Sequence, residues 1–149
     1  MKKLFLFGFL LVTAVFGVGC SDDDVMQDGY YTAETSDYDF GWKEFVTITV
    51  KNNEIVSVEY NAKNPSGFIK SWDNAYMRNM GRVRGVYPNK YTREYASELL
   101  KTQSKDKIDD VSGATSSGAK FKALAEAVIE QAKKGDSSIV SVQIEPAKE

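Results

Sequence analysis

The sequence predicts an α+β domain in which helices pack on a largely antiparallel sheet. Residues 46–60 alternate apolar and polar side chains on either side of a short Asn-rich turn, which indicates a β-hairpin. Two later segments repeat apolar residues at helical spacing. Most strands precede the helices along the chain, an order typical of α+β folds. A length of 149 residues suits one domain once a leader is removed.

Residues 1–19 resemble a lipoprotein signal peptide. Lys2-Lys3 is followed by an apolar run that is too short to span a bilayer comfortably. The run ends at Gly19-Cys20, and Cys20 is the only cysteine of the chain. We expect Cys20 to become the acylated N-terminus of the mature protein, with residues 20–27 as an acidic tether to a bacterial membrane outside the cytoplasm. The alternative is a conventional signal peptide, or an uncleaved anchor, with an incidental cysteine.

The predicted domain covers residues 28–149 and opens with strands. Asp28-Gly29 gives a turn, and the aromatic and β-branched residues after it favour a strand. Residues 42–50 and 55–60 then form the hairpin. Its alternation predicts one buried face made of Val46, Ile48, Val50, Val56, Val58 and Tyr60.

The next predicted element is a short helix over residues 71–80, after a loop marked by Pro65 and Gly67. Trp72, Tyr76 and Met80 form one stripe of this helix at spacing i, i+4 and i+8. Such a stripe ordinarily packs in the core. The functional alternative is that Trp72 or Tyr76 stacks near a bound ring.

The second half of the domain is predicted to be mainly helical. Arg82 and Arg84 lie in a predicted loop, either solvated or meeting a phosphate. Amphipathic helices are expected over residues 91–102 and 120–132, the second followed by a Lys-Lys-Gly end. A last strand is expected over residues 138–144.

The composition excludes several classes of function. The chain has no histidine, which excludes a Ser-His-Asp triad and any histidine-ligated haem or zinc. A single cysteine excludes a disulfide framework, an iron–sulfur cluster and a CxxC redox pair. The net charge of −2 and the lack of a basic patch argue against nucleic acid as a partner. An electron-transfer function would therefore require an organic cofactor.

Small and hydroxyl-bearing residues fill the segment 109–118, directly before the last predicted helix. Gly113 and Gly118 allow the backbone to approach a ligand closely. The free N–H groups and the dipole of the helix that follows favour an anion such as phosphate. The alternative is an ordinary helix cap, in which Ser or Thr accepts the unpaired N–H bonds.

The order Asp109, Ser112, Gly113, Ala114, Thr115 resembles the flavin-attachment signature of the FMN-binding domain family. That family includes the C subunit of the sodium-pumping NADH:quinone oxidoreductase, the G subunit of the Rnf complex and the small lipoproteins called major membrane immunogen. The chain looks most similar to these lipoproteins, over about residues 28–135. In covalently flavinylated members a flavin transferase joins FMN to the final Thr through a phosphoester. The resemblance implies FMN as cofactor and Thr115 as its acceptor.

The resemblance also implies roles for neighbouring residues. Ser112 and Gly113 would shape the loop, the helix from Ser116 would face the phosphate, and Asp109 would serve recognition or chemistry during attachment. The implied function is a membrane-anchored carrier that passes electrons between unidentified redox partners, rather than an enzyme with its own substrate. The alternative is a non-redox surface lipoprotein that uses the same fold as a ligand-binding or interaction module.

We predict that Cys20→Ser releases the protein from membranes, because the variant has no sulfur to acylate. Membrane and soluble fractions of wild type and variant would be compared, with mass spectrometry of the N-terminal peptide. Recovery of an unmodified Cys20 inside an uncleaved leader from wild-type cells would contradict the prediction.

Overall fold

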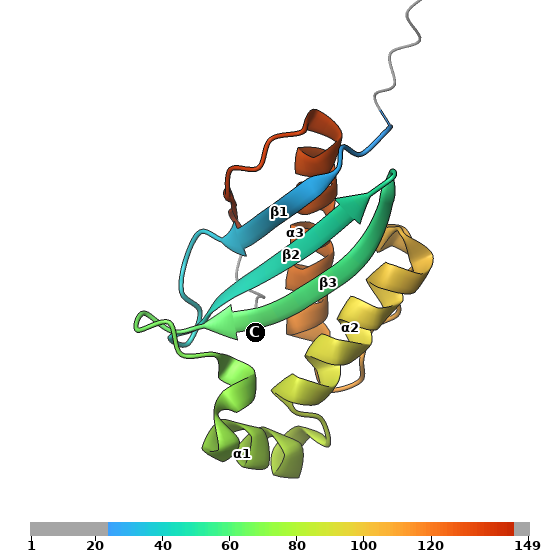
Figure 1. The fold of residues 1–149 in the computed structure, drawn as a ribbon. Coiled ribbons are helices and arrows are strands. Elements are labelled where there is room, and N and C mark those ends of the chain that lie inside the picture. The colour runs from blue at the N-terminus through green and yellow to red at the C-terminus, as the bar shows by residue number, and fades with distance from the viewer. Residues whose placement is uncertain (1–23, 145–149) are drawn as a thin grey trace, which may run out of the picture.

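The computed structural model describes residues 24–144, which form a sheet with helices on one of its faces (Figure 1). The predicted signal peptide and Cys20 lie outside the described residues. In chain order the elements are the strands β1 (Gly29–Thr35), β2 (Lys43–Lys51) and β3 (Glu54–Lys63), the 3-10 turn η1 (Lys70–Trp72), the helices α1 (Asn74–Arg84) and α2 (Pro88–Thr102), the 3-10 turn η2 (Lys105–Lys107), the helix α3 (Thr115–Lys134) and the strand β4 (Val140–Val142).

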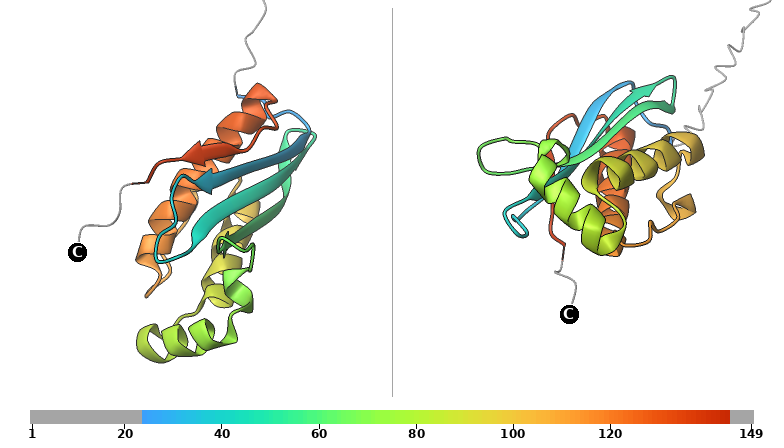
Figure 2. Two further views of the ribbon diagram at one scale, coloured as in Figure 1. Left: turned by 90° about the vertical axis from the view of Figure 1, so that its left-hand side faces the viewer. Right: turned by 90° about the horizontal axis from the view of Figure 1, so that it is seen from below.

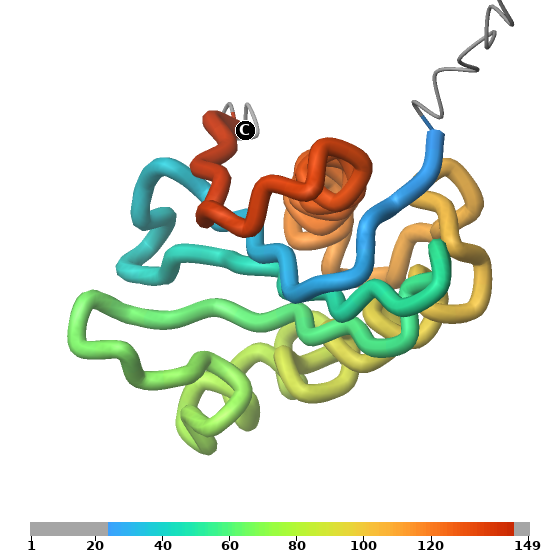
Figure 3. The backbone as a smooth tube through the Cα atoms, turned by 45° about the horizontal axis from the view of Figure 1, so that its top comes forward, coloured from blue at the N-terminus to red at the C-terminus, as the bar shows by residue number. Residues whose placement is uncertain are grey.

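The sheet has the strand order β3-β2-β1-β4. The pairs β1–β2 and β2–β3 are antiparallel, and β4 pairs with β1 in parallel. The chain reaches β4 through the long helix α3, which lies behind the sheet (Figures 1 and 3). The predicted α+β class with a largely antiparallel sheet is confirmed. Within residues 24–144, no helix is long and apolar enough to cross a membrane.

The hydrophobic core lies between the sheet and the two helices α2 and α3, which cover the same face (Figure 2). At its centre the Phe121 ring lies 4.7 Å from the Tyr60 ring and 5.3 Å from the Tyr95 ring, centroid to centroid. Burying each large apolar side chain contributes about 1.5–3 kcal/mol. The apolar stripes predicted for the two helices are buried at Tyr91, Tyr95, Leu99, Phe121, Leu124, Ala125 and Val128.

The predicted hairpin face is wrong at Val56, whose side chain is 48% exposed. The register shifts between Thr49 and Val50, so that Thr49 pairs with Ser57 and Val50 pairs with Ile55. Val56 has no partner in this bulge, and Ile55 takes its place in the core. The other predicted members are buried or half-buried: Val46, Ile48, Val50, Val58 and Tyr60.

The predicted helix over residues 71–80 lies three residues further along the chain, as α1. It begins after Asp73, whose carboxylate accepts the N–H of Tyr76 at 2.9 Å and so caps the helix. It continues through Arg84, which was predicted to lie in a loop, and ends at Gly85 with φ +70°.

The predicted core stripe of this helix is also wrong. Trp72 lies in η1 and is 66% exposed, and α1 contains no buried residue. The physical reason is position: α1 lies beyond the end of the sheet, where α2 and α3 already cover the apolar face (Figure 1). Tyr76 and Met80 are half-buried and line a cavity instead of the core.

We predict opposite effects for Gly118→Ala in α3 and Gly81→Ala in α1. A Cβ at Gly118 would lie 3.0 Å from Cζ of Tyr95 and closer still to its hydroxyl, so the variant should lose about 1–3 kcal/mol. A Cβ at Gly81 would meet nothing nearer than 3.6 Å, and the better helix propensity of alanine should add up to about 1 kcal/mol. Chemical denaturation measures both changes, and equal gains in stability would contradict the close contact at Gly118.

Candidate functional site

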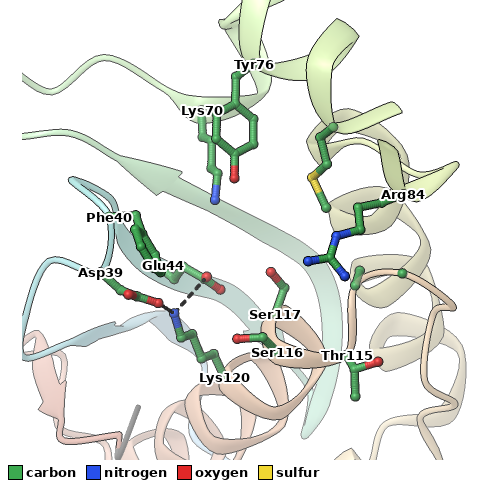
Figure 4. A pocket seen from close by; sticks show the side chains of 13 residues that line it. Asp39, Phe40, Glu44, Lys70, Tyr76, Arg84, Thr115, Ser116, Ser117 and Lys120 are labelled. Atoms are coloured by element: carbon green, nitrogen blue, oxygen red, sulfur yellow. Dashed lines mark hydrogen bonds and ion pairs between the residues drawn. The ribbon is translucent and has the colours of Figure 1, made fainter. Parts of the chain in front are cut away.

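A cavity of about 360 Å³ lies where α1, the start of α3, the start of β2 and the loop after β1 meet (Figure 4). This volume falls within the range of small-molecule sites. The residues of the sequence motif that line it are Gly113, Ala114, Thr115, Ser116 and Ser117.

The helix α3 begins at Thr115, five residues before the predicted start at Lys120. Tyr95 of α2 holds the segment that leads into it. The Tyr95 hydroxyl accepts the N–H of Val111 at 2.9 Å and donates to the carbonyl of Ala114 at 3.4 Å. The motif is therefore a fixed turn followed by the first turn of a helix.

Gly113 brings this turn against the end of α1. Its φ of +82° favours glycine, and a Cβ there would lie only 2.7 Å from the carbonyl oxygen of Arg84. No other residue fits without moving one of the two backbones. This close approach places the side chain of Arg84 at the cavity, with its guanidinium directed toward the start of α3 (Figure 4).

The N-terminus of α3 has no side-chain cap, because its N-cap residue is Ala114. The first helical hydrogen bond runs from the N–H of Gly118 to the carbonyl of Ala114, at 2.9 Å. The N–H groups of residues 115–117 lie outside this ladder, at the positive end of a helix of 20 residues. Such an end favours a negatively charged ligand.

Lys70 and Arg84 add positive charge to the cavity. The Lys70 side chain points into it (Figure 4), and the residue is only 8% exposed. Its Nζ lies 4.7 Å from the centre of the Tyr76 ring. Within residues 24–144, neither Lys70 nor Arg84 forms an ion pair. A nearly buried ammonium without a carboxylate partner favours an anionic or electron-rich ligand.

A buried acid lies on the opposite side of the cavity from Arg84. Glu44 is 5% exposed, and its Oε1 lies 3.6 Å from Nζ of Lys120, which also pairs with Asp39 (Figure 4). Its Oε2 is hydrogen-bonded to the hydroxyl of Tyr60. The same hydroxyl lies 2.9 Å from the carbonyl oxygen of Ser117.

Burial raises the pKa of Glu44 above its ordinary value. The hydrogen bond with Tyr60 and the charges of Lys120 and Lys70 oppose this rise without cancelling it. Burial and the neighbouring Glu44 also raise the pKa of Tyr60, so the phenol stays protonated. The cavity therefore holds a carboxyl group that binds its proton more tightly than a surface glutamate does.

Phe40 forms the rim of the cavity in an unusual backbone conformation. The N–H of Asp39 donates to the carbonyl of Trp42 at 2.8 Å, and the N–H of Trp42 donates to the carbonyl of Asp39 at 3.0 Å. These two hydrogen bonds close the two-residue turn Phe40-Gly41. Phe40 has φ +48° and is 92% exposed. Positive φ is rare for a bulky residue. The β2–β3 turn, by contrast, uses Asn52-Asn53, a common choice for this conformation.

The structure brings together part of the predicted site. Gly113, Ala114, Thr115, Ser116 and Tyr76 line the cavity. Asp109, Ser112 and Trp72 are exposed and do not line it. The backbone N–H of Asp109 donates to Glu98 at 2.9 Å, which ties the start of the motif to α2.

Sequence reasoning missed Phe40, Glu44, Lys70 and Lys120. Glu44 carried a usable signal, because it shares the inward-facing register of Val46 and Ile48, where a charged residue is unexpected. A phenylalanine in a tight turn was a weaker signal. Nothing local marks Lys70, whose burial depends on how η1 lies against β3 and Tyr76.

Comparisons with known proteins relate the chain to a lipoprotein and to a solved structure. No family model matches it. It is 34% identical over 133 residues to the 15 kDa lipoprotein of Treponema pallidum (strain Nichols), covering 89% of this chain and 94% of that one. The crystal structure of the CPE2226 protein from Clostridium perfringens superimposes with a TM-score of 0.78 at 36% identity, covering 81% of this chain and 100% of that one. The chain belongs to the family of the 15 kDa lipoprotein.

Proposed function

We propose that this chain is an extracytoplasmic electron carrier, anchored to a membrane through acylated Cys20, with FMN attached to Thr115 by a phosphoester. One observation carries the proposal: the exposed Thr115 is the first residue of an uncapped helix, at the edge of a cavity with two cationic side chains that form no ion pair within residues 24–144. The match to the flavin-attachment signature supports the choice of ligand.

The start of α3 suits the phosphate end of FMN. A phosphodiester on Thr115 keeps one negative charge beside the free N–H groups of residues 115–117. Arg84 offers a guanidinium, which binds phosphate oxygens in a fixed geometry. Because Ala114 offers no capping oxygen, no side chain of the N-cap competes with the phosphate for these donors.

The rest of the cavity suits the isoalloxazine ring. Tyr76, Met80 and Phe40 offer aromatic and polarizable surface, and Lys70 offers a positive charge for the polar edge of a ring. When bound, FMN supplies the one- and two-electron chemistry that the side chains of this chain lack. These residues bind the ring, orient it and limit its contact with water.

Membership in a lipoprotein family supports the membrane-anchored part of the proposal. A covalent bond would retain the cofactor outside the cytoplasm, where lost FMN is not readily replaced. The flavin transferase would then be a required partner, and the electron donor and acceptor would be other proteins. A chain that stays colourless after co-expression with a transferase would favour the alternative, a non-redox ligand-binding lipoprotein.

We predict that Thr115→Val abolishes covalent flavin when the protein is co-expressed with a flavin transferase. Valine is nearly isosteric and cannot form the phosphoester, so the fold should persist. Ultraviolet fluorescence of the denatured band, followed by peptide mass mapping, measures the bond. Ser116→Ala is the matched control and should keep it. Fluorescence that survives denaturation in the Thr115 variant, or that maps to Ser116, would reject the assignment.

We predict that Phe40→Asn weakens FMN binding without a loss of stability. Asparagine adopts positive φ more readily than phenylalanine, so the melting temperature should stay equal or rise. An aromatic contact worth about 0.5–1.5 kcal/mol corresponds to a roughly two- to twelvefold loss of affinity. FMN titration, monitored by flavin fluorescence, is best done in the Thr115→Val background, where all binding is non-covalent.

The matched control is Asn52→Phe, which places the same ring at φ +53° in the other turn. This variant should be less stable than wild type and bind FMN equally well. Unchanged FMN affinity in Phe40→Asn would show that the ring of Phe40 makes no contact with the ligand.

A further inference from the structure

The Tyr60 hydroxyl lies between two oxygen atoms that can accept its single hydrogen. Its oxygen is within hydrogen-bond distance of both Oε2 of Glu44 and the carbonyl oxygen of Ser117. A phenol carries one hydrogen, and a backbone carbonyl only accepts. With Tyr60 donating to Ser117, the contact with Glu44 needs a hydrogen on the carboxyl group. The geometry thus gives a chain from the Glu44 carboxyl through Tyr60 to the first turn of α3.

The positive charges around Glu44 do not prevent its carboxyl group from holding a proton. Lys120 of α3 lies 3.6 Å from Oε1, too far for a strong hydrogen bond, and pairs with Asp39 of the loop after β1. The other charged or titratable groups that face the carboxyl or share its cavity are Lys70 of η1, Tyr76 and Arg84 of α1, and Tyr91 of α2. Burial outweighs the cations and raises the pKa of Glu44.

Glu44 is only 5% exposed, and the part of it that is exposed lines the cavity. Its two carboxyl oxygens each have one partner, Lys120 at Oε1 and Tyr60 at Oε2. Here the carboxyl group is held at the wall of the proposed flavin site, with a tyrosine that can reverse its hydrogen bond.

We propose that Glu44 is the acid of this cavity: it holds a proton at Oε2 and exchanges it with the ligand when the ligand gains or loses electrons. This inference rests on the proposed function. Full reduction of FMN to FMNH₂ takes up two electrons and two protons. The electrons come from an external redox protein, Glu44 gives one proton, and the other comes from solvent.

The residues around Glu44 can support both of its states. After the O–H bond of the carboxyl breaks, the hydrogen of Tyr60 turns from the Ser117 carbonyl to the new carboxylate. Lys120 then faces a negative charge at 3.6 Å instead of a neutral acid. A proton from solvent at the cavity mouth restores the carboxyl group. In the reverse direction, oxidation of the ligand returns a proton to Glu44.

The protonated state can be tested without any flavin, through the pH dependence of unfolding. Glu44 binds its proton more tightly in the folded chain, so wild type loses stability as pH rises from the ordinary value of 4.5 through the folded-state pKa. Glu44→Gln cannot ionise. Its stability relative to wild type should therefore rise across this pH window. A relative fall would mean that Glu44 is an ionised partner of Lys120, and would overturn the proposal.

The matched control is Glu34→Gln on the open face of the sheet. Burial acts to raise the pKa of Glu34, but hydrogen bonds and charges from Lys63 and Lys43 outweigh it and hold the pKa below 4.5. This variant should fall in stability relative to wild type as pH rises, opposite in sign to Glu44→Gln. Infrared spectra give a direct readout: a protonated-carboxyl band absent from Glu44→Gln should titrate at higher pH than the other carboxyl groups.

Flavin-loaded protein tests the exchange itself. The reduction potential of the bound flavin would be plotted against pH. In wild type the slope of this plot should change at the pH where the infrared band of Glu44 titrates, and in Glu44→Gln this change should be absent. Identical slopes in the two loaded proteins would overturn the exchange and leave flavin binding intact. A wild type that never loads flavin would reject the proposed function and the exchange with it, while the infrared and unfolding data would still report the state of Glu44.

Discussion

The close approach of Gly113 to the carbonyl of Arg84 determines the geometry of the whole site. Two backbones meet at a point where a Cβ would lie 2.7 Å from the carbonyl oxygen. This contact joins α1, which packs on no face of the sheet, to α3, which crosses the core. The contact places Arg84 beside the start of α3, whereas Tyr76 is also held by the ring of Trp42, 6.1 Å away between centroids. The cavity exists because a peripheral helix is held against a central one.

The cavity combines two electrostatic features that are costly alone. Lys70 is nearly buried and has no carboxylate partner among the described residues, and Glu44 is buried beside a phenol and a lysine that is shared with Asp39. A folded protein ordinarily pairs such groups with each other. Lys70 and Glu44 line the same cavity but do not pair with each other: Glu44 contacts Lys120 and Tyr60, and Lys70 has no ion-pair partner within residues 24–144. An FMN molecule has a negative phosphate and a ring that changes its proton count, so it would use both features.

The sequence predicted the elements whose burial follows from local periodicity. Alternation in β2 and helical spacing in α2 and α3 report on burial directly, and these elements were confirmed. The bulge at Val56 depends on how the β2–β3 turn closes, which alternation does not encode. The predicted stripe of Trp72, Tyr76 and Met80 was wrong because Trp72 lies before α1, in η1, and α1 itself lies beyond the end of the sheet. Lys70 and Phe40 join the site through tertiary contacts of turns, so no motif included them.

The direction of β1 determines which end of the domain carries the mouth of the cavity. β1 starts at Gly29, near the described N-terminal end, and runs toward the loop that carries Phe40 (Figure 1). If Cys20 is acylated as proposed, only residues 21–25 separate it from Met26, which packs on the core and donates its N–H to Asn53 at 2.8 Å, so the tether is about 20 Å at full extension. In that arrangement the open mouth of the cavity would lie at the end of the domain away from the membrane. A soluble redox partner of the proposed carrier would then reach the cavity directly, whereas a partner embedded in the same membrane would reach it only when the domain tilts on its tether.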